Sequence, residues 1–238
     1  MPKAKNEAKK VIFFDLGGTL FEFHEKRFNA LLGDIAGASR EEVSVALQYD
    51  IGKGEYHQLW IDLETVSIGL FEFYKRVKKI LKKGGILNHD FSFTDFFRIF
   101  TDRRVFELYP FSLPLIKCLN EKGLILGIIS NINGVHWVIL KTSYKELFNM
   151  FSVKIPSFEI RVRKPKEKIW KVALESVDER RTSPSDCIFV DDRKENVLSA
   201  SKFGMKGIHF RGYVDPVEKL LSRLSYELGI DINLKLKR

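Results

Sequence analysis

The stretch "VIFFDLGGTLFEF", residues 11–23, decides how the rest of the sequence is interpreted. Its first four residues form a continuous apolar run of β-branched and aromatic side chains, which is typical of a strand buried on both faces of a parallel sheet. The run ends at Asp15, and Gly17 and Gly18 then indicate a loop. Whether the Asp15 carboxylate has chemical partners depends on the residues at the ends of the other strands.

Beyond residue 105 the sequence alternates between strands and helices. Apolar runs predict strands over 124–130, 151–155, 186–192 and 206–210, and helical patterns fall over 113–123, 134–144, 166–177, 194–204 and 215–228. Such regular alternation predicts an α/β fold, a doubly wound parallel sheet with helices on both faces. We therefore expect residues 11–21 and 106–230 to form this Rossmann-like core.

Residues 22–105 have a different, helical texture without a convincing strand. Ser39 and Glu42 form a capping box that opens one helix, and helical patterns over 67–83 and 93–104 predict two more. We interpret 22–105 as an inserted helical cap. The aromatic residues of the cap are expected mainly to form its own core, and the alternative is that a few side chains, such as Tyr56, His57 or Trp60, face the cleft. Residues 1–10 and 231–238 are expected to be tails, the first of them flexible and basic.

Polar residues follow the predicted strands at the points where they end. Asp15 follows the first strand, Ser130 and Asn131 follow "LILGII", and Asp191 and Asp192 follow "CIFV". Each alone would be an ordinary turn or cap residue. Ligands of parallel sheets bind beyond the carboxyl ends of the strands, where these residues should meet.

The predicted cluster has the chemistry of a magnesium and phosphate site. Three carboxylates at one sheet edge repel each other unless a divalent cation lies among them, and all-oxygen ligands suit Mg²⁺. Lys164, before a proline at the start of a helix, adds an ammonium group. With a hydroxyl and an amide it would hold the oxygens of a phosphoryl group while Asp15 attacks phosphorus.

At this point the sequence resembles the haloacid dehalogenase-like hydrolases, in the branch with a helical cap after the first strand. "FFDLGGTL", "LGIISNINGV", "RKPKEKIW" and "IFVDDRKENVLSASKFGMKGIHF" match the four motifs of the family, and the resemblance covers residues 11–228. It implies that Asp15 is the nucleophile and that Lys164 is its counter-charge and a phosphate contact.

The same resemblance implies the remaining site residues. Ser130 and Asn131 would bind the phosphate, and Thr19 would help to hold the first loop and the phosphate. The Mg²⁺ ligands would be Asp15, Asp192, the backbone carbonyl of Gly17, and Asp191 directly or through water. A small phosphorylated metabolite is the implied substrate.

Gly17 departs from the pattern of the family, whose phosphatases usually carry a second Asp at this position. That Asp protonates the leaving oxygen and then activates water, so its absence predicts a slow phosphatase, with a loss of about 10² to 10⁴ in rate. His24, Glu22 and Glu25 follow closely and are candidates to replace it. Two alternatives remain: a catalytically weakened binding or regulatory protein, and a metal-independent 2-haloacid dehalogenase.

Composition sets limits on the other classes of function. The 238 residues are 45% hydrophobic and 30% charged, with a net charge of +9, which indicates a globular chain with a Lys-rich surface. The Lys residues do not form one aromatic-interleaved stripe, so we do not expect a nucleic-acid partner. The apolar runs are too short to span a bilayer, and Cys118 and Cys187 lack metal-ligand spacing. We expect a cytoplasmic protein that does not enter membranes; the sequence leaves its oligomeric state open.

Overall fold

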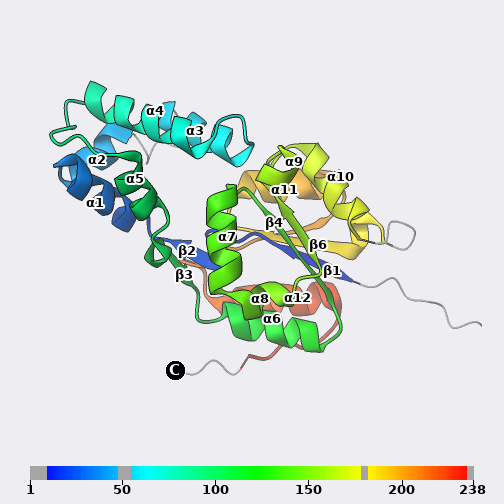
Figure 1. Ribbon diagram of the computed structural model, residues 1–238. Helices are drawn as coiled ribbons and strands as arrows, with labels where there is room; N and C mark the ends of the chain where they lie inside the picture. The colour runs from blue at the N-terminus through cyan, green and yellow to red at the C-terminus, as the bar shows by residue number, and fades with distance from the viewer. Residues whose placement is uncertain (1–9, 48–54, 178–181, 235–238) are drawn as a thin grey trace, which may run out of the picture. The chain divides into compact units, whose positions relative to one another are not determined.

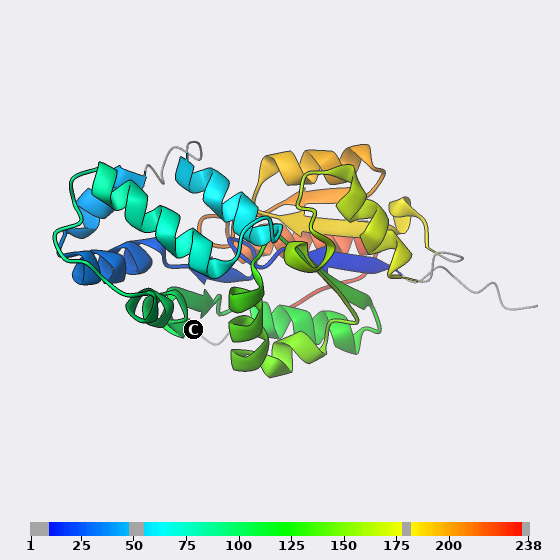
Figure 2. The same cartoon turned by 45° about the horizontal axis from the view of Figure 1, so that its top comes forward.

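The computed structural model describes residues 10–47, 55–177 and 182–234, which form two compact units (Figures 1 and 2). Unit 1 comprises Met1–Glu22, Leu108–Asn131 and Tyr144–Arg238, and unit 2 comprises Phe23–Glu107 and Ile132–Ser143. Most of the two predicted tails lies outside the described residues. Within the C-terminal stretch, Ile232 is buried and its N–H donates to Ser225 Oγ at 3.2 Å.

Unit 1 is built on a parallel sheet with the strand order β5-β4-β1-β6-β7. The strands are β1 (Val11–Phe14), β4 (Ile125–Ser130), β5 (Val153–Pro156), β6 (Cys187–Asp191) and β7 (Lys206–His209). The strand β1 lies at the centre, and all its residues are fully buried, as its continuous apolar run predicts. The doubly wound parallel sheet is confirmed.

Helices cover both faces of this sheet. In Figure 1, α9 (Ser157–Ile160), α10 (Glu167–Glu175) and α11 (Lys194–Lys202) lie on one face, and α6 (Ser112–Glu121), α8 (Lys145–Asn149) and α12 (Val217–Leu228) on the other. On the first face Val11, Phe13 and Phe189 pack with Trp170, whose indole N–H donates to Ser199 Oγ at 2.9 Å. The alternating side chains of β1 thus supply both layers of the core.

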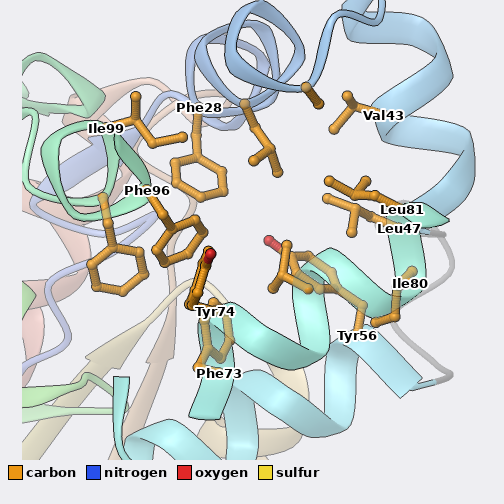
Figure 3. Packing of buried hydrophobic residues seen from close by; sticks show 14 of the residues in the cluster. Phe28, Val43, Leu47, Tyr56, Phe73, Tyr74, Ile80, Leu81, Phe96 and Ile99 are labelled. Carbon is orange, nitrogen blue, oxygen red and sulfur yellow. The ribbon is translucent and has the colours of Figure 1, made fainter. Parts of the chain in front are cut away.

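Unit 2 is helical and has a core of its own. It contains α1 (Glu25–Ala36), α2 (Arg40–Leu47), α3 (Glu55–Glu64), α4 (Leu70–Lys83), α5 (Phe93–Phe100) and α7 (Gly134–Ser143). Figure 3 shows the aromatic and aliphatic side chains of α1 to α5 that meet in its interior, Tyr56 among them, and Trp60 packs against the same cluster. The predicted capping box is confirmed, because Ser39 N–H donates to Glu42 Oε2 at 2.7 Å and Glu42 N–H donates to Ser39 Oγ at 3.2 Å.

One pairing of strands lies outside the sequence prediction. The short strands β2 (Phe21–Phe23) and β3 (Phe106–Leu108) pair with each other, although 22–105 was expected to be helical. Three residues carry too little periodicity to reveal a strand whose partner is far away in the sequence.

Among the described residues, no helix combines the length and the apolar character needed to cross a bilayer.

The helix α7 contributes a buried histidine to unit 2. The ring of His136 stacks on Phe100 with 4.3 Å between centroids, and its Nε2 lies 3.1 Å from Phe100 O. Because this carbonyl only accepts, Nε2 carries the proton, and Nδ1 accepts from Asn133 Nδ2 at 3.0 Å. The same Asn133 amide is oriented by His136 N–H, which donates to its Oδ1 at 3.0 Å. Protonation of Nδ1 would therefore place its N–H group opposite the N–H group of Asn133 Nδ2, and the hydrogen bond between them would be lost.

The buried, neutral His136 predicts that the folded state loses stability as the pH falls. Burial lowers the pKa of His136 from 6.5 to about 3, so the folded protein binds this proton less readily than the unfolded chain. Stability that is present above pH 6.5 is lost as the pH falls towards 3, by about 2 kcal/mol at pH 5. His136→Gln should lack this contribution, so its free energy of unfolding should fall less between pH 8 and pH 5 in urea titrations. Equal pH slopes for both proteins would contradict the assignment.

Candidate active site

The register of the sheet places Asp15 beside Asp191. Phe14 pairs with Val190, and Asp15 N–H donates to Val190 O at 2.9 Å. Asp15 is the first residue after β1, and Asp191 is the last residue of β6. Adjacent parallel strands that end together present their terminal side chains at the same sheet edge. The structure thus brings together two residues that are separated by most of the chain.

Lys164 connects these two carboxylates. Its side chain is fully buried, and Nζ lies 2.9 Å from Asp15 Oδ1 and 2.6 Å from Asp191 Oδ2. Burial alone would lower the pKa of Lys164, but the charges of Asp15 and Asp191 outweigh burial and raise it. The ammonium group therefore stays charged, and it donates hydrogen bonds to both carboxylates.

Asn131 holds the backbone of Lys164. Lys164 N–H donates to Asn131 Oδ1 at 2.8 Å, and Asn131 Nδ2 donates to Lys164 O at 3.1 Å. The Asn131 amide follows β4 directly, so it ties the Lys164 loop to the sheet edge. The side chain predicted to bind phosphate thus has a structural task as well.

Asp191 and Asp192 differ sharply in their hydrogen bonds. Asp191 Oδ1 accepts from Arg193 N–H at 2.8 Å, the amide of Asn196 donates to both carboxylate oxygens at 3.0 and 3.1 Å, and Lys164 completes the set. The Asp192 carboxylate is half-buried, and among the described residues no hydrogen bond or ion pair is recorded for it. Asp191 is thus committed to the protein, whereas Asp192 remains available to a ligand.

Asn196 was missed by the sequence prediction. It lies in the first turn of α11, is 2% exposed, and donates a hydrogen bond from its side-chain amide to Asp191. Its position five residues after Asp191, on the helix that follows the strand, was the available signal. That signal is weak, because an Asn near a helix N-terminus usually has a local role.

The electrostatics of the cluster fit a divalent cation. Asp15, Asp191 and Asp192 each offer a carboxylate oxygen, and these atoms lie within 4.8 Å of one another. Burial, followed by the charges of Asp15 and Asp191, raises the pKa of Asp192 to about 7. Burial likewise raises the pKa of Asp15 to about 6, although Lys164 and a hydrogen bond from Ser130 oppose the rise. With all three carboxylates ionised, the cluster and the ammonium group would carry a net charge of minus two, which a divalent cation would balance.

The loop after Asp15 folds tightly against this cluster. Leu16 N–H donates to Asp15 Oδ1 at 2.7 Å, and Gly18 N–H donates to Phe21 O at 2.7 Å. Gly18 has a φ of +74°, and a Cβ on it would meet Asp192 Oδ2 at 2.3 Å. A Cβ on Gly17, by contrast, would meet no atom of the described residues within 4 Å. Backbone conformation and the close approach of Asp192 therefore favour glycine at position 18, whereas position 17 has room for a side chain.

The other predicted residues have distinct surroundings. Thr19 Oγ1 is buried and has no hydrogen-bond partner in the described parts of the chain, so it can receive a ligand or water. Among the candidates to replace the missing acid–base group, His24 Nε2 lies 2.9 Å from Glu107 Oε2, and Glu25 Oε1 accepts from Asn29 Nδ2 at 3.3 Å. Both are thus already engaged with groups of unit 2.

Comparison with known proteins shows the family of this chain. The profile of the haloacid dehalogenase-like hydrolases matches residues 9–204, most of the chain. The chain belongs to this family. A sesquiterpene phosphatase from Aspergillus oryzae is 25% identical over 208 residues, covering 84% of this chain and 89% of the relative.

Solved structures of this hydrolase family share the fold. A family enzyme from Bacteroides thetaiotaomicron has a TM-score of 0.70 at 18% identity, covering 90% of this chain and 99% of that one. Its complex with magnesium and inorganic phosphate has a TM-score of 0.67 at 20% identity, with coverage of 87% and 96%. The L-2-haloacid dehalogenase from Xanthobacter autotrophicus has a TM-score of 0.59 at 18% identity, with coverage of 83% and 75%. The fold alone therefore does not choose between attack at phosphorus and attack at carbon.

The two glycines of the motif allow a matched test. Gly18→Ala should destabilise the protein by at least about 1–2 kcal/mol, because alanine is strained at positive φ and its Cβ would displace Asp192. Gly17→Ala has open space and should change stability little. Thermal unfolding of both variants beside the wild type measures the difference. Equal midpoints for the two variants would contradict the close approach of Gly18 to Asp192.

Proposed function

We propose that this hydrolase is a Mg²⁺-dependent phosphatase that acts on a small phosphorylated metabolite through an aspartyl-phosphate intermediate. One observation carries the proposal: the ammonium group of Lys164 lies between Asp15 and Asp191, with Asp192 uncommitted beside them. The phosphatase activity named for the Aspergillus relative, and the magnesium and phosphate bound by the Bacteroides enzyme, support it.

In this proposal Asp15, Asp192 and the backbone carbonyl of Gly17 bind Mg²⁺, and Asp191 contributes directly or through water. When bound, Mg²⁺ would neutralise the clustered carboxylates and polarise a phosphoryl oxygen. The hydrogen bonds of Asp191 to Lys164 and Asn196 favour the indirect role for it, because all its acceptor directions are in use. Asp192 is then the carboxylate on which metal affinity chiefly depends.

The phosphate would be held by groups at the end of β4 and around Lys164. Ser130 offers its hydroxyl, and Asn131 offers its backbone N–H, since its side-chain amide already binds the Lys164 backbone. Thr19 would help to hold the first loop, and its hydroxyl, which has no hydrogen-bond partner among the described residues, would be a further donor to the phosphate. Lys164 would contact a phosphate oxygen with the proton that it does not give to the two carboxylates.

The reaction then proceeds in two displacements. A carboxylate oxygen of Asp15 attacks phosphorus as the bond from phosphorus to the ester oxygen breaks, and the leaving oxygen takes a proton from water. Water then attacks the aspartyl-phosphate, which releases inorganic phosphate and regenerates the Asp15 carboxylate. Because residue 17 is Gly, no carboxyl group at this position assists either proton transfer, so we propose a slow turnover.

Gly17 also keeps a second candidate function in view, a binding or regulatory protein with this fold. It would bind Mg²⁺ and phosphate at the same residues without repeated turnover. A 2-haloacid dehalogenase is disfavoured, because it works without a metal, and three clustered carboxylates without a cation would repel an anionic haloacid.

Asp15 is the residue whose loss should abolish turnover. Asp15→Asn removes the nucleophilic oxygen, and phosphate release from a panel of phosphate esters, isoprenoid phosphates included, should fall by at least about 10³-fold. Asp34→Asn, on the exposed side of α1, is the matched control and should keep full activity. Undiminished activity in Asp15→Asn would rule out the proposed intermediate, and chloride release from a 2-haloacid without metal would favour the dehalogenase.

Restoring a carboxyl group at position 17 should accelerate hydrolysis. The open space at Gly17 accommodates Asp, and acid–base assistance contributes about 10² to 10⁴ in rate. Gly17→Asn is the control, because it has the same shape without the transferable proton. Steady-state and burst-phase release of phosphate should be higher for Gly17→Asp than for Gly17→Asn. If only Gly17→Asp turns over, the wild type fits the binding protein; equal rates for the two variants would exclude a missing acid–base group.

A further inference from the structure

We propose that His209 is a positioning residue for the metal site, acting through the backbone of Asp192. The inference rests on the proposed function and concerns a residue that touches neither phosphate nor metal. His209 is the last residue of β7, and its Nε2 lies 2.9 Å from the carbonyl oxygen of Asp192. This oxygen only accepts, so Nε2 donates the hydrogen bond.

His209 holds the backbone of Asp192, which lies one residue beyond the last pair of β6 with β7. The pairing of β6 with β7 ends at Asp191 opposite His209, and the last backbone bond runs from Phe210 N–H to Asp191 O at 3.0 Å. Asp192 lies beyond the end of β6. The imidazole of His209 therefore supplies for Asp192 the anchor that the sheet supplies for the residues before it.

The same segment also holds the loop on the other side of the site. Gly212 N–H donates to Gly18 O at 2.7 Å, and Gly18 is the residue against which the Asp192 carboxylate lies. A Cβ on Gly212 would meet Tyr109 Cε2 at 2.4 Å and Thr19 O at 2.8 Å, so the backbone can approach this closely only at glycine. Residues 209–212 thus bind the loop after β1 and the loop after β6 together.

This anchor should matter for Asp192 and little for Asp191. Asp191 is fixed by Lys164, Asn196 and the N–H of Arg193, whereas no side-chain hydrogen bond is recorded for Asp192 within the described residues. The direction of the Asp192 carboxylate therefore depends on its backbone and on the close contact with Gly18. Loss of a partner that orients a metal ligand typically weakens metal binding by about 10- to 100-fold.

The test uses Mg²⁺ alone and a pair of variants that differ in one donor. His209→Leu removes the hydrogen bond, and His209→Gln keeps an N–H group near the position of Nε2. Isothermal titration with MgCl₂ should give about 10-fold weaker binding for His209→Leu and near wild-type binding for His209→Gln. In assays, the Mg²⁺ concentration for half-maximal rate should rise by a similar factor in His209→Leu, while kcat at saturating Mg²⁺ stays within about 3-fold.

The outcomes separate this inference from the proposed function. Asp192→Asn is the reference variant and should lose Mg²⁺ binding. If the wild type binds no Mg²⁺, or Asp192→Asn binds it normally, the proposed metal site is wrong and the inference falls with it. If both behave as expected but His209→Leu binds Mg²⁺ like the wild type, or His209→Gln binds as weakly as His209→Leu, only the role of the His209 donor is overturned.

Discussion

The site depends on one buried ammonium group. The side chain of Lys164 has no access to solvent, and its charge is compensated by the carboxylates of Asp15 and Asp191. Removing one partner of such a buried pair leaves an uncompensated charge, which costs about 3–5 kcal/mol. The contact therefore fixes the end of β1, the end of β6 and the Lys164 loop relative to one another. The Asn131 amide, which clasps the backbone of Lys164, joins β4 to the same arrangement.

Around this group the two adjacent aspartates divide the work. Asp191 has every acceptor direction occupied and serves to position Lys164 and the start of α11. Asp192 points into a region where negative charge is already concentrated, and burial raises its pKa before any neighbouring charge adds to the effect. Asp191 thus makes the site rigid, and Asp192 adds a carboxylate that is available for binding. A cation would bind favourably to such a pre-organised group of carboxylates.

The sequence predicted the parts of the fold that are encoded locally. Buried parallel strands are continuous apolar runs, so the strands that end at Asp15, Ser130 and Asp191 could be recognised, and their common edge followed from the parallel topology. The capping box of Ser39 and Glu42 could also be predicted, because both residues lie within one helical turn.

Contacts between distant segments could not be predicted in the same way. Nothing in the pattern around Asn196 or His209 says which carboxylate or carbonyl each one meets, since both contacts depend on the final register. The pairing of β2 with β3 needs two three-residue segments from opposite ends of the helical stretch. Ile132–Ser143 belongs to unit 2, where His136 stacks on Phe100, and no helical periodicity reveals this long-range contact.

The open space beside Gly17 has a consequence for how such a protein evolves. A Cβ on Gly18 would meet Asp192 and a Cβ on Gly212 would meet Tyr109, but a Cβ at residue 17 would meet no described residue within 4 Å. In the proposed mechanism, a substitution at residue 17 would therefore change the lifetime of the phosphorylated aspartate without repacking the loop. A fast phosphatase and a slow one would then differ by a single residue.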